Sequence, residues 1–276
     1  MNLLNCQQLA VERAGRVLVD AVDLALASGE VLHILGANGC GKSTLLLQMA
    51  GLQPPLSGQI MFAGQQLAKL PAADLALARQ LLPQQQQIPF ALLVADYLAM
   101  CWSACGFGGS RWLAREEVSE CCAALDLTHL LARDIHQLSG GEWQRVRLAA
   151  SACLIDKRLN PAAKLWLLDE PFSALDLRHK RDLLLLIGKR AASGIAVALV
   201  HHEPALAFAH ASRVLLLGEG RQLAWACAPE ALTAANLQRA FGVGAHLAQI
   251  GQQQVLITDI DLPFSASSQG QGAASC

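Results

Sequence analysis

The sequence predicts an α/β fold in which helices cover both faces of a largely parallel sheet and a helical subdomain interrupts the chain. Three observations support this expectation. Apolar runs alternate with helical segments over residues 164–217, a pattern typical of a buried parallel sheet. An earlier apolar run, residues 31–35, leads directly into a glycine-rich loop. From Gln84 to about residue 150 the pattern is mostly helical instead.

The N-terminal part of the chain predicts mainly strands. Residues 1–30 alternate between apolar and polar side chains, as short strands do. Residues 45–50 predict a helix that ends at Gly51. A short strand is expected over residues 58–64, and the alanine- and leucine-rich residues 67–82 are expected to be partly helical.

The second half of the core is expected to alternate strand and helix. The expected elements are strand 164–168, helix 177–192, strand 195–200, helix 204–211 and strand 213–217. We expect one domain over residues 1–261 and a disordered tail over residues 262–276, which is rich in Ser, Gly, Gln and Ala from residue 265 onward. The expected parts of that domain are an α/β core with an N-terminal β lobe (1–83 and 151–242), a helical subdomain (84–150) and C-terminal strands (243–261).

Composition and charge exclude several classes of protein. Lys and Arg total 21 against 22 Asp and Glu, so no strong field attracts nucleic acid or an anionic membrane. No apolar stretch reaches the roughly 20 residues that span a bilayer, and the N-terminus does not have the pattern of a signal peptide. The nine cysteines are irregularly spaced, which favours reduced thiols over disulfides. Cys101 and Cys105 lie four residues apart, but no second ligand pair follows at zinc spacing.

The first motif is a phosphate-binding loop that fits G-x-x-x-x-G-K-[ST]. It reads Gly36-Ala37-Asn38-Gly39-Cys40-Gly41-Lys42-Ser43-Thr44. Glycines let successive N–H groups point inward at phosphate oxygens, and the helix that follows aims its positive end at the same place. Lys42 adds a charge for the β and γ phosphates, and the Ser43 hydroxyl is the expected Mg²⁺ ligand. We therefore expect ATP and Mg²⁺ as ligands, with ATP contacts from Gly36, Asn38, Gly39, Gly41, Lys42, Ser43 and Thr44.

The second motif places two carboxylates, Asp169 and Glu170, directly after a buried apolar run. Asp169 is placed to hold Mg²⁺ through water, as Mg²⁺ prefers. Glu170 is the candidate general base that polarises the attacking water. Such a pair alone would often be a solvated turn, but here a phosphate-binding loop precedes it.

A third motif runs Leu138-Ser139-Gly140-Gly141-Glu142. Ser139 has the character of a helix N-cap followed by two glycines. Taken alone, the motif would be an ordinary capped helix. Beside the other two motifs it predicts a second anion site at a helix N-terminus.

The motifs resemble those of the ATP-binding cassette (ABC) ATPases and follow one another along the chain in the order typical of that family. The resemblance extends from near the N-terminus to about residue 242. The family signature is Leu-Ser-Gly-Gly-Gln or a close variant, and Glu142 takes its fifth place here. The resemblance implies a RecA-like P-loop NTPase core with a small antiparallel β lobe and an inserted α-helical subdomain.

The same resemblance assigns roles to further residues. Gln84 corresponds to the Q-loop glutamine, which reaches Mg²⁺ and senses the γ-phosphate. Asp176 corresponds to the D-loop residue that addresses the other subunit. His202 corresponds to the catalytic switch histidine at the γ-phosphate; His201 is the competitor, and His202 is favoured because the acidic Glu203 follows it.

The resemblance also implies a homodimer arranged head to tail. Ser139, Gly140, Gly141 and Glu142 of one subunit would then contact the ATP that the other subunit holds. Hydrolysis would separate the two subunits again, because the γ-phosphate is part of their interface.

Two positions leave alternatives open. The family commonly stacks an aromatic side chain on adenine near Arg13, but no aromatic residue lies there. Arg13 or Arg16 could stack through its guanidinium plane, or the adenine is held loosely. Cys40, inside the phosphate-binding loop, is either just a small residue or a thiol whose alkylation blocks ATP.

Finer details are similar to the ATPase subunits of bacterial vitamin B12 (cobalamin) importers. These details are residues 141–150, the Asn160-Pro161-Ala162 turn in an insertion at 156–163, His33, and the glutamine run into Pro89-Phe90. The similarity implies an energy-coupling subunit for cobalamin uptake on the cytoplasmic face of the bacterial inner membrane. It implies two membrane permease subunits as partners and, indirectly, a periplasmic cobalamin-binding protein, with no nucleic acid. Alternatives are the ATPase of a ferric-siderophore or haem importer and a soluble, non-transport ABC ATPase.

Overall fold

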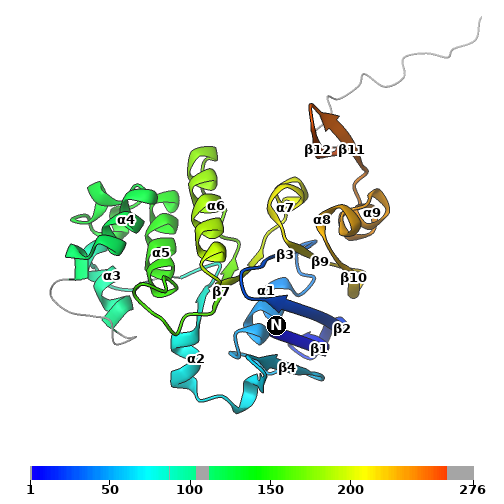
Figure 1. Cartoon of the computed structure of the whole chain (residues 1–276), viewed down its shortest axis with the longest axis horizontal. Coiled ribbons are helices and arrows are strands. Elements are labelled where there is room, and N and C mark those ends of the chain that lie inside the picture. Colours follow the sequence, from blue (N-terminus) through cyan, green and yellow to red (C-terminus); the bar gives the residue numbers. More distant parts are fainter. Residues whose placement is uncertain (1, 87, 104–111, 260–276) are drawn as a thin grey trace, which may run out of the picture.

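The computed structural model describes residues 2–86, 88–103 and 112–259 (Figure 1). Ten strands form one sheet: β1 (Asn2–Arg13), β2 (Arg16–Ala27), β3 (Val31–Gly36), β4 (Gln59–Phe62), β5 (Gln65–Gln66), β6 (Arg79–Leu82), β7 (Leu165–Asp169), β8 (Ala196–Val200), β9 (Arg213–Gly218) and β10 (Arg221–Ala226). Two more strands, β11 (Ala245–Ile250) and β12 (Gln253–Thr258), form a separate antiparallel hairpin. The predicted disordered tail, residues 262–276, lies outside the described residues.

Helices of the described ranges lie around this sheet. The α-helices are α1 (Lys42–Met49), α2 (Ala72–Ala78), α3 (Val94–Ser103), α4 (Glu116–Ala124), α5 (Gly140–Leu154), α6 (Leu177–Ala192), α7 (Pro204–His210), α8 (Ala228–Ala231) and α9 (Ala234–Phe241). Short 3-10 turns are η1 (Leu67–Lys69), η2 (Trp112–Ala114), η3 (Thr128–Leu130) and η4 (Ile135–Gln137). No helix in these ranges is both long and apolar enough to cross a bilayer.

The sheet has a parallel half and an antiparallel half. Its strand order is β5-β4-β1-β2-β10-β9-β3-β8-β7-β6. Strands β9, β3, β8, β7 and β6 run parallel to one another, whereas β1, β2, β4 and β5 pair antiparallel. The predicted α/β core with a small antiparallel β lobe is confirmed, and the sheet as a whole is mixed.

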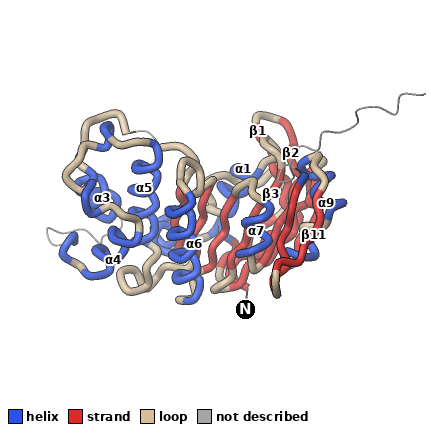
Figure 2. The backbone as a smooth tube through the Cα atoms, turned by 90° about the horizontal axis from the view of Figure 1, so that it is seen from above, coloured by secondary structure: helices blue, strands red, loops and turns tan. Residues whose placement is uncertain are grey.

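Helices cover both faces of the parallel strands, as predicted. Along β7, Leu165 and Leu167 pack into a core shared with β1, β2 and α1. Trp166 and Leu168 face the opposite way, into a core shared with α3, α4, α5 and α6. Figure 2 shows the strands lying between α1 and the pair α6 and α7. This alternation explains why the central strands β7 and β8 are apolar almost throughout.

The expectation that residues 67–82 are partly helical is confirmed, but a strand that the sequence did not predict follows the helix. The helix expected within residues 67–82 ends at Ala78, and the next four residues form the edge strand β6. Strand β6 pairs in parallel with β7, so Arg79 lies opposite Leu165. Tertiary pairing overrides the helical preference of this short segment.

The helical subdomain groups α3, α4 and α5 at one end of the molecule, away from the β11–β12 hairpin (Figure 1). Cys105 lies outside the described residues. The motif loops follow the carboxyl ends of β3, β6, β7 and β8. In parallel sheets such ends meet at one edge, where ligands bind.

Candidate functional site

The phosphate-binding loop joins β3 to α1 through backbone conformations that favour glycine. Gly36 has φ 151° and Gly41, the N-cap of α1, has φ 102°. A Cβ on Gly36 would lie 2.5 Å from the carbonyl oxygen of Leu217, so no larger residue fits there. The loop is therefore shaped by close packing against β9 as well as by its own turn.

Lys42 is buried at the start of α1 and crosses back over the loop. Its Nζ donates hydrogen bonds to the carbonyl oxygens of Gly36 at 2.8 Å and Ala37 at 2.9 Å. An ammonium group has three donors. These two contacts hold the charge over the loop and leave a third donor for a phosphate oxygen.

Ser43 and Asp169 form a pair of oxygen donors that fits Mg²⁺. The Ser43 hydroxyl donates to Asp169 Oδ1 at 3.1 Å. Burial raises the pKa of the Asp169 carboxyl, as does the neighbouring charge of Glu170, while the Ser43 hydrogen bond opposes the shift. A buried carboxylate beside a hydroxyl is a hard, oxygen-only environment in which a divalent cation would relieve the cost of burying the charge.

Glu170 sits directly after β7 in a strained backbone conformation. Its φ is 49°, in the left-handed region, and its N–H donates to the carbonyl of Val200 at 2.9 Å. Gln84 Nε2 donates to Glu170 Oε2 at 2.8 Å. No hydrogen bond or ion pair in the described ranges joins Gln84 to Ser43 or Asp169. Gln84 thus meets the expected general base rather than the expected Mg²⁺ ligands.

A cavity of about 520 Å³ brings most of the predicted residues together. Its lining residues are Arg13, Ala14, Leu18, Asn38, Gly39, Gly41, Lys42, Ser43, Thr44, Gln84, Glu170 and His202. Arg13 lines it and Arg16 does not, so only one of the two candidate arginines is placed to stack on a base. Leu18 adds an apolar wall beside it.

The two neighbouring histidines lie in opposite environments. His202 is exposed and faces the cavity, whereas His201 is 2% exposed and points into the protein. His201 bonds to His33 of β3, Nε2 to Nδ1, at 2.7 Å. The geometry therefore favours His202 as the residue that could reach a phosphate.

The third motif is not part of this cavity. Ser139 is the N-cap of α5 and forms a reciprocal capping box, in which the Glu142 N–H donates to Ser139 Oγ and the Ser139 N–H donates to Glu142. The hydrogen bond from the Ser139 N–H, together with the Ser139 hydroxyl, holds the pKa of the Glu142 carboxyl below its ordinary value. The capping box thus gives a local structural reason for Glu142 at the fifth signature position. In the sequence, the S-x-x-E spacing indicates this capping box.

The two glycines of this motif differ in their surroundings. A Cβ on Gly141 would lie 2.6 Å from the carbonyl oxygen of Ala174, so the start of α5 packs tightly on the loop before α6. A Cβ on Gly140 would meet its nearest neighbour, the Ala174 side chain, only at 3.9 Å. Gly141 is needed for packing within the chain, while Gly140 is not.

Asp176 also lies away from the cavity. It is the N-cap of α6, where its carboxylate accepts from the His179 N–H at 2.9 Å. That hydrogen bond lowers the pKa of the carboxyl. Its side chain is 65% exposed, which leaves it accessible to another molecule.

Two buried residues of α5, Gln144 and Arg147, connect the motifs and were not predicted as site residues. Arg147 donates to the carbonyls of Pro83 and Gln84, and Gln144 Nε2 donates to the carbonyl of Pro171 at 3.1 Å. They tie the signature helix to the Q-loop and to the residue after Glu170. The sequence gives no distinct signal for these two residues, because α5 also contains the polar residues Glu142, Arg145 and Ser151.

Cys40 packs beneath the loop. Its Sγ would lie 2.7 Å from a Cβ on Gly36, and its side chain contacts the core under α1. Burial raises the pKa of the thiol, although the charge of Lys42 partly opposes this. The structure favours the reading of Cys40 as a small packing residue.

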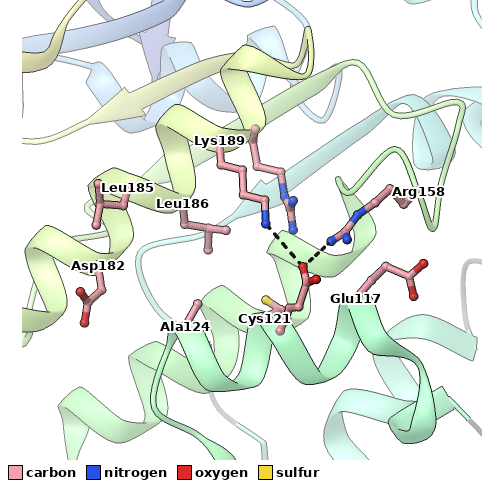
Figure 3. Close-up of a pocket in the computed structure, with 10 residues that line it drawn as sticks. Glu117, Cys121, Ala124, Arg158, Asp182, Leu185, Leu186 and Lys189 are labelled. Atoms are coloured by element: carbon pink, nitrogen blue, oxygen red, sulfur yellow. Dashed lines mark hydrogen bonds and ion pairs between the residues drawn. The ribbon is translucent and has the colours of Figure 1, made fainter.

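A second hollow, of about 290 Å³, lies between α4 and α6, away from all of the motifs (Figure 3). Glu120 accepts there from Arg158 at 2.9 Å and from Lys189 at 3.4 Å. Beneath them, buried Asp156 pairs with Arg158 at 2.8 Å and Arg190 at 2.9 Å. The insertion at 156–163 thus joins α4 and α6 through ion pairs.

Comparisons with known proteins agree with this geometry. The ABC transporter family model matches residues 19–173, more than half of the chain. The chain is 40% identical over 233 residues to the vitamin B12 import ATP-binding protein BtuD of Escherichia coli O45:K1, covering 84% of this chain and 90% of BtuD. The BtuD proteins of Escherichia coli O81 and O127:H6 match equally well.

Solved structures give the same fold. An inward-facing metal-chelate type ABC transporter matches with a TM-score of 0.73 and 27% identity, over 94% of this chain and 98% of that one. CbiO1 from Clostridium perfringens, part of the ABC transporter complex cbiONQ, matches with a TM-score of 0.68 and 23% identity, over 86% and 93% of the two chains. The chain belongs to the ABC transporter family and has the fold of its ATPase subunits.

Proposed function

We propose that this chain is the ATP-hydrolysing, energy-coupling subunit of an ABC importer, with vitamin B12 as its most strongly supported substrate. The observation that carries the ATPase assignment is the cavity that gathers Lys42, Ser43, Gln84, Glu170 and His202. Loop amides, a buried cation, a candidate base and an exposed imidazole around one space are the parts that phosphoryl transfer requires.

The residues have distinct proposed roles in hydrolysis. Lys42 and the loop amides hold the β and γ phosphates, and Glu170 orients the attacking water in line with the bond that breaks. His202 contacts the γ-phosphate. Ser43 and Asp169 would hold Mg²⁺, with Gln84 as a further candidate ligand, and the ion would supply charge neutralisation at the phosphates. Gln84 already bonds Glu170, so it also holds the base in place.

A second copy of the chain completes the proposed site. Ser139 and Gly140 stand at the N-terminus of α5 but do not line the cavity that contains Lys42. In a head-to-tail homodimer, each α5 N-terminus would face the ATP of the other subunit and add its amides and dipole. Asp176, exposed at the N-cap of α6, would lie at the same interface.

The proposed membrane partners are two permease subunits that dock on the helical subdomain. A hollow of about 350 Å³ lies there between the glutamine run and the start of α5, lined partly by Gln86, Ile88 and Trp143. Nearby, Phe90 is 52% exposed and Leu93 is 43% exposed. Large apolar side chains left open beside a hollow favour a partner surface.

The substrate rests on kinship with BtuD and needs a direct test. The chain would be co-expressed with a candidate permease and reconstituted in liposomes, with ATP hydrolysis measured as binding protein is added. Stimulation by cobalamin-loaded binding protein supports the B12 assignment. Stimulation by a ferric siderophore or haem instead supports the chelate alternative, and the structural match to a metal-chelate type transporter is why that alternative is included. Hydrolysis that never responds to a permease would favour a non-transport ATPase.

A further inference from the structure

A buried pair of histidines links the phosphate-loop strand to the loop that carries His202. His33 lies in β3, three residues before Gly36, and His201 directly precedes His202. Both side chains are fully enclosed, at 0% and 2% exposure. Their rings meet edge to face, with centroids 4.9 Å apart and Nδ1 of His33 at 2.7 Å from Nε2 of His201.

The hydrogen bonds determine the tautomer of each ring. The backbone N–H of Glu203 donates to His201 Nδ1 at 3.2 Å, so this nitrogen carries the lone pair. Burial lowers the pKa of both imidazoles, that of His33 to about 3, which keeps the pair neutral. The proton of His201 therefore sits on Nε2 and is donated to His33 Nδ1. The proton of His33 is left on Nε2, which has no partner among the described residues.

Other contacts hold the same loop from two further sides. The Phe172 ring meets His201 edge to face, with centroids 5.7 Å apart, and Phe172 lies two residues after Glu170. Lys180 of α6 bonds Glu203 at 2.8 Å. The loop before α7 is thus fixed to β3, to the segment after β7 and to α6, while His202 alone turns outward into the cavity.

We infer that His201 is a positioning residue, whose Nε2–H donated to His33 fixes the loop so that His202 is held toward the γ-phosphate. This inference rests on the proposed function of His202. A buried unpartnered donor is costly, and the pair retains one on His33. An apolar pair would fill this space without that cost, so packing alone does not account for two imidazoles here.

The test compares substitutions of His201 alone and together with His202. His201→Leu removes the hydrogen bond, and we expect kcat to fall by about 10- to 100-fold with the Kd for ATP unchanged, because a misplaced group costs rate rather than binding. His201→Gln keeps an N–H donor and should retain most of kcat. His246→Gln, on the exposed β11, is the matched control and should leave both quantities unchanged.

The decisive readout is coupling between the two histidines. In a His202→Ala background, His201→Leu should cost little further kcat, because its effect passes through His202. Independent, multiplying losses would overturn the inference, as would equal losses for His201→Gln and His201→Leu. Nitrogen-15 NMR provides a test that does not depend on turnover: an Nδ1–H tautomer or a charged His201 would also overturn it. Absence of ATPase activity in the wild type would instead refute the proposed function and leave the tautomer result standing.

Discussion

Glu170 combines a strained backbone with a held side chain. A non-glycine residue at φ 49° costs on the order of 1 kcal/mol, and such strain is kept where the surroundings over-determine it. Here the N–H is fixed to β8 and the carboxylate to Gln84. The carboxylate is thereby aimed into the cavity before any ligand arrives.

Replacing this carboxylate isolates its role as a base. We expect Glu170→Gln to bind ATP normally but to lower kcat by about 10²- to 10⁴-fold, because a neutral amide does not accept the proton of the attacking water. Steady-state phosphate release and equilibrium binding of ATP measure the two effects. The control is Glu219→Gln, at an exposed β9–β10 turn. Near-normal turnover in Glu170→Gln would sink the assignment.

The half-buried thiol of Cys40 leads to a prediction about reactivity. The thiolate is the reactive form, and a raised pKa leaves little of it at neutral pH. N-ethylmaleimide should therefore label Cys40 more slowly in the folded chain than in the denatured chain, and labelling should accelerate as the pH rises. ATPase activity should survive brief treatment at neutral pH. If mass spectrometry shows rapid labelling of Cys40 in the folded chain together with loss of ATP binding, the alternative interpretation, in which alkylation of Cys40 blocks ATP, would be supported.

At the scale of elements, the sequence predicts most of the framework. The expected helix at 177–192 coincides with α6, and strand 195–200 differs from β8 by one residue. Both follow from local patterns that act within one segment. Strand β6 was missed because its four residues become a strand only by pairing with β7.

Some residues of the candidate site could likewise be predicted from the sequence, and others could not. Motif spacing predicts Lys42, Ser43, Asp169 and Glu170, because their chemistry is written in consecutive residues. The contacts of Arg147 with the Q-loop and the neutral pair of His33 and His201 depend on three-dimensional packing. No single-segment pattern encodes such long-range contacts.

The ion pairs around the 156–163 insertion predict a stability effect. The side chains of Asp156 and Arg190 are 4% and 5% exposed, so removing one charge leaves the other buried without that partner. We expect Asp156→Asn to lower the free energy of unfolding by on the order of 3 kcal/mol in urea denaturation. The control is Asp182→Asn, which breaks an i,i+4 pair with mostly exposed Arg178, and should cost less than about 0.5 kcal/mol.

The pKa of the Asp156 carboxyl predicts how the stability difference between wild type and Asp156→Asn depends on pH. Burial alone would raise the pKa of Asp156, but hydrogen bonds from Arg158 and the charge of Arg190 bring it below its ordinary value of 3.8. A depressed pKa in the folded state stabilises the protein above the unfolded-state pKa, and the contribution is lost as the pH falls through the folded-state value. The difference in the free energy of unfolding between wild type and Asp156→Asn should therefore decrease below about pH 4. A gap that is constant with pH would contradict this.

At the scale of the whole molecule, the separation of the two proposed anion sites is the main constraint. The cavity holds Lys42, and Gly140 stands at the start of a different helix outside it. Within one chain neither site completes the other. Two chains related by a twofold axis would form two equivalent composite sites, each with a loop from one chain and a signature from the other.

Mixing two inactive variants tests this arrangement directly. Gly140→Asp has room within its own chain and suits a helix N-terminus, but it would place a negative charge against the partner's phosphates. Lys42→Ala removes the ammonium group that we propose binds the phosphates. Each variant alone should be inactive. Mixed in equal amounts with free exchange, half of the dimers are hybrids with one intact site, so activity should recover to roughly a quarter of wild type if the two sites act independently. A site built within one chain could not be restored by mixing, so recovery of activity would support the composite site. If hybrid dimers form and activity does not recover, the composite site is contradicted.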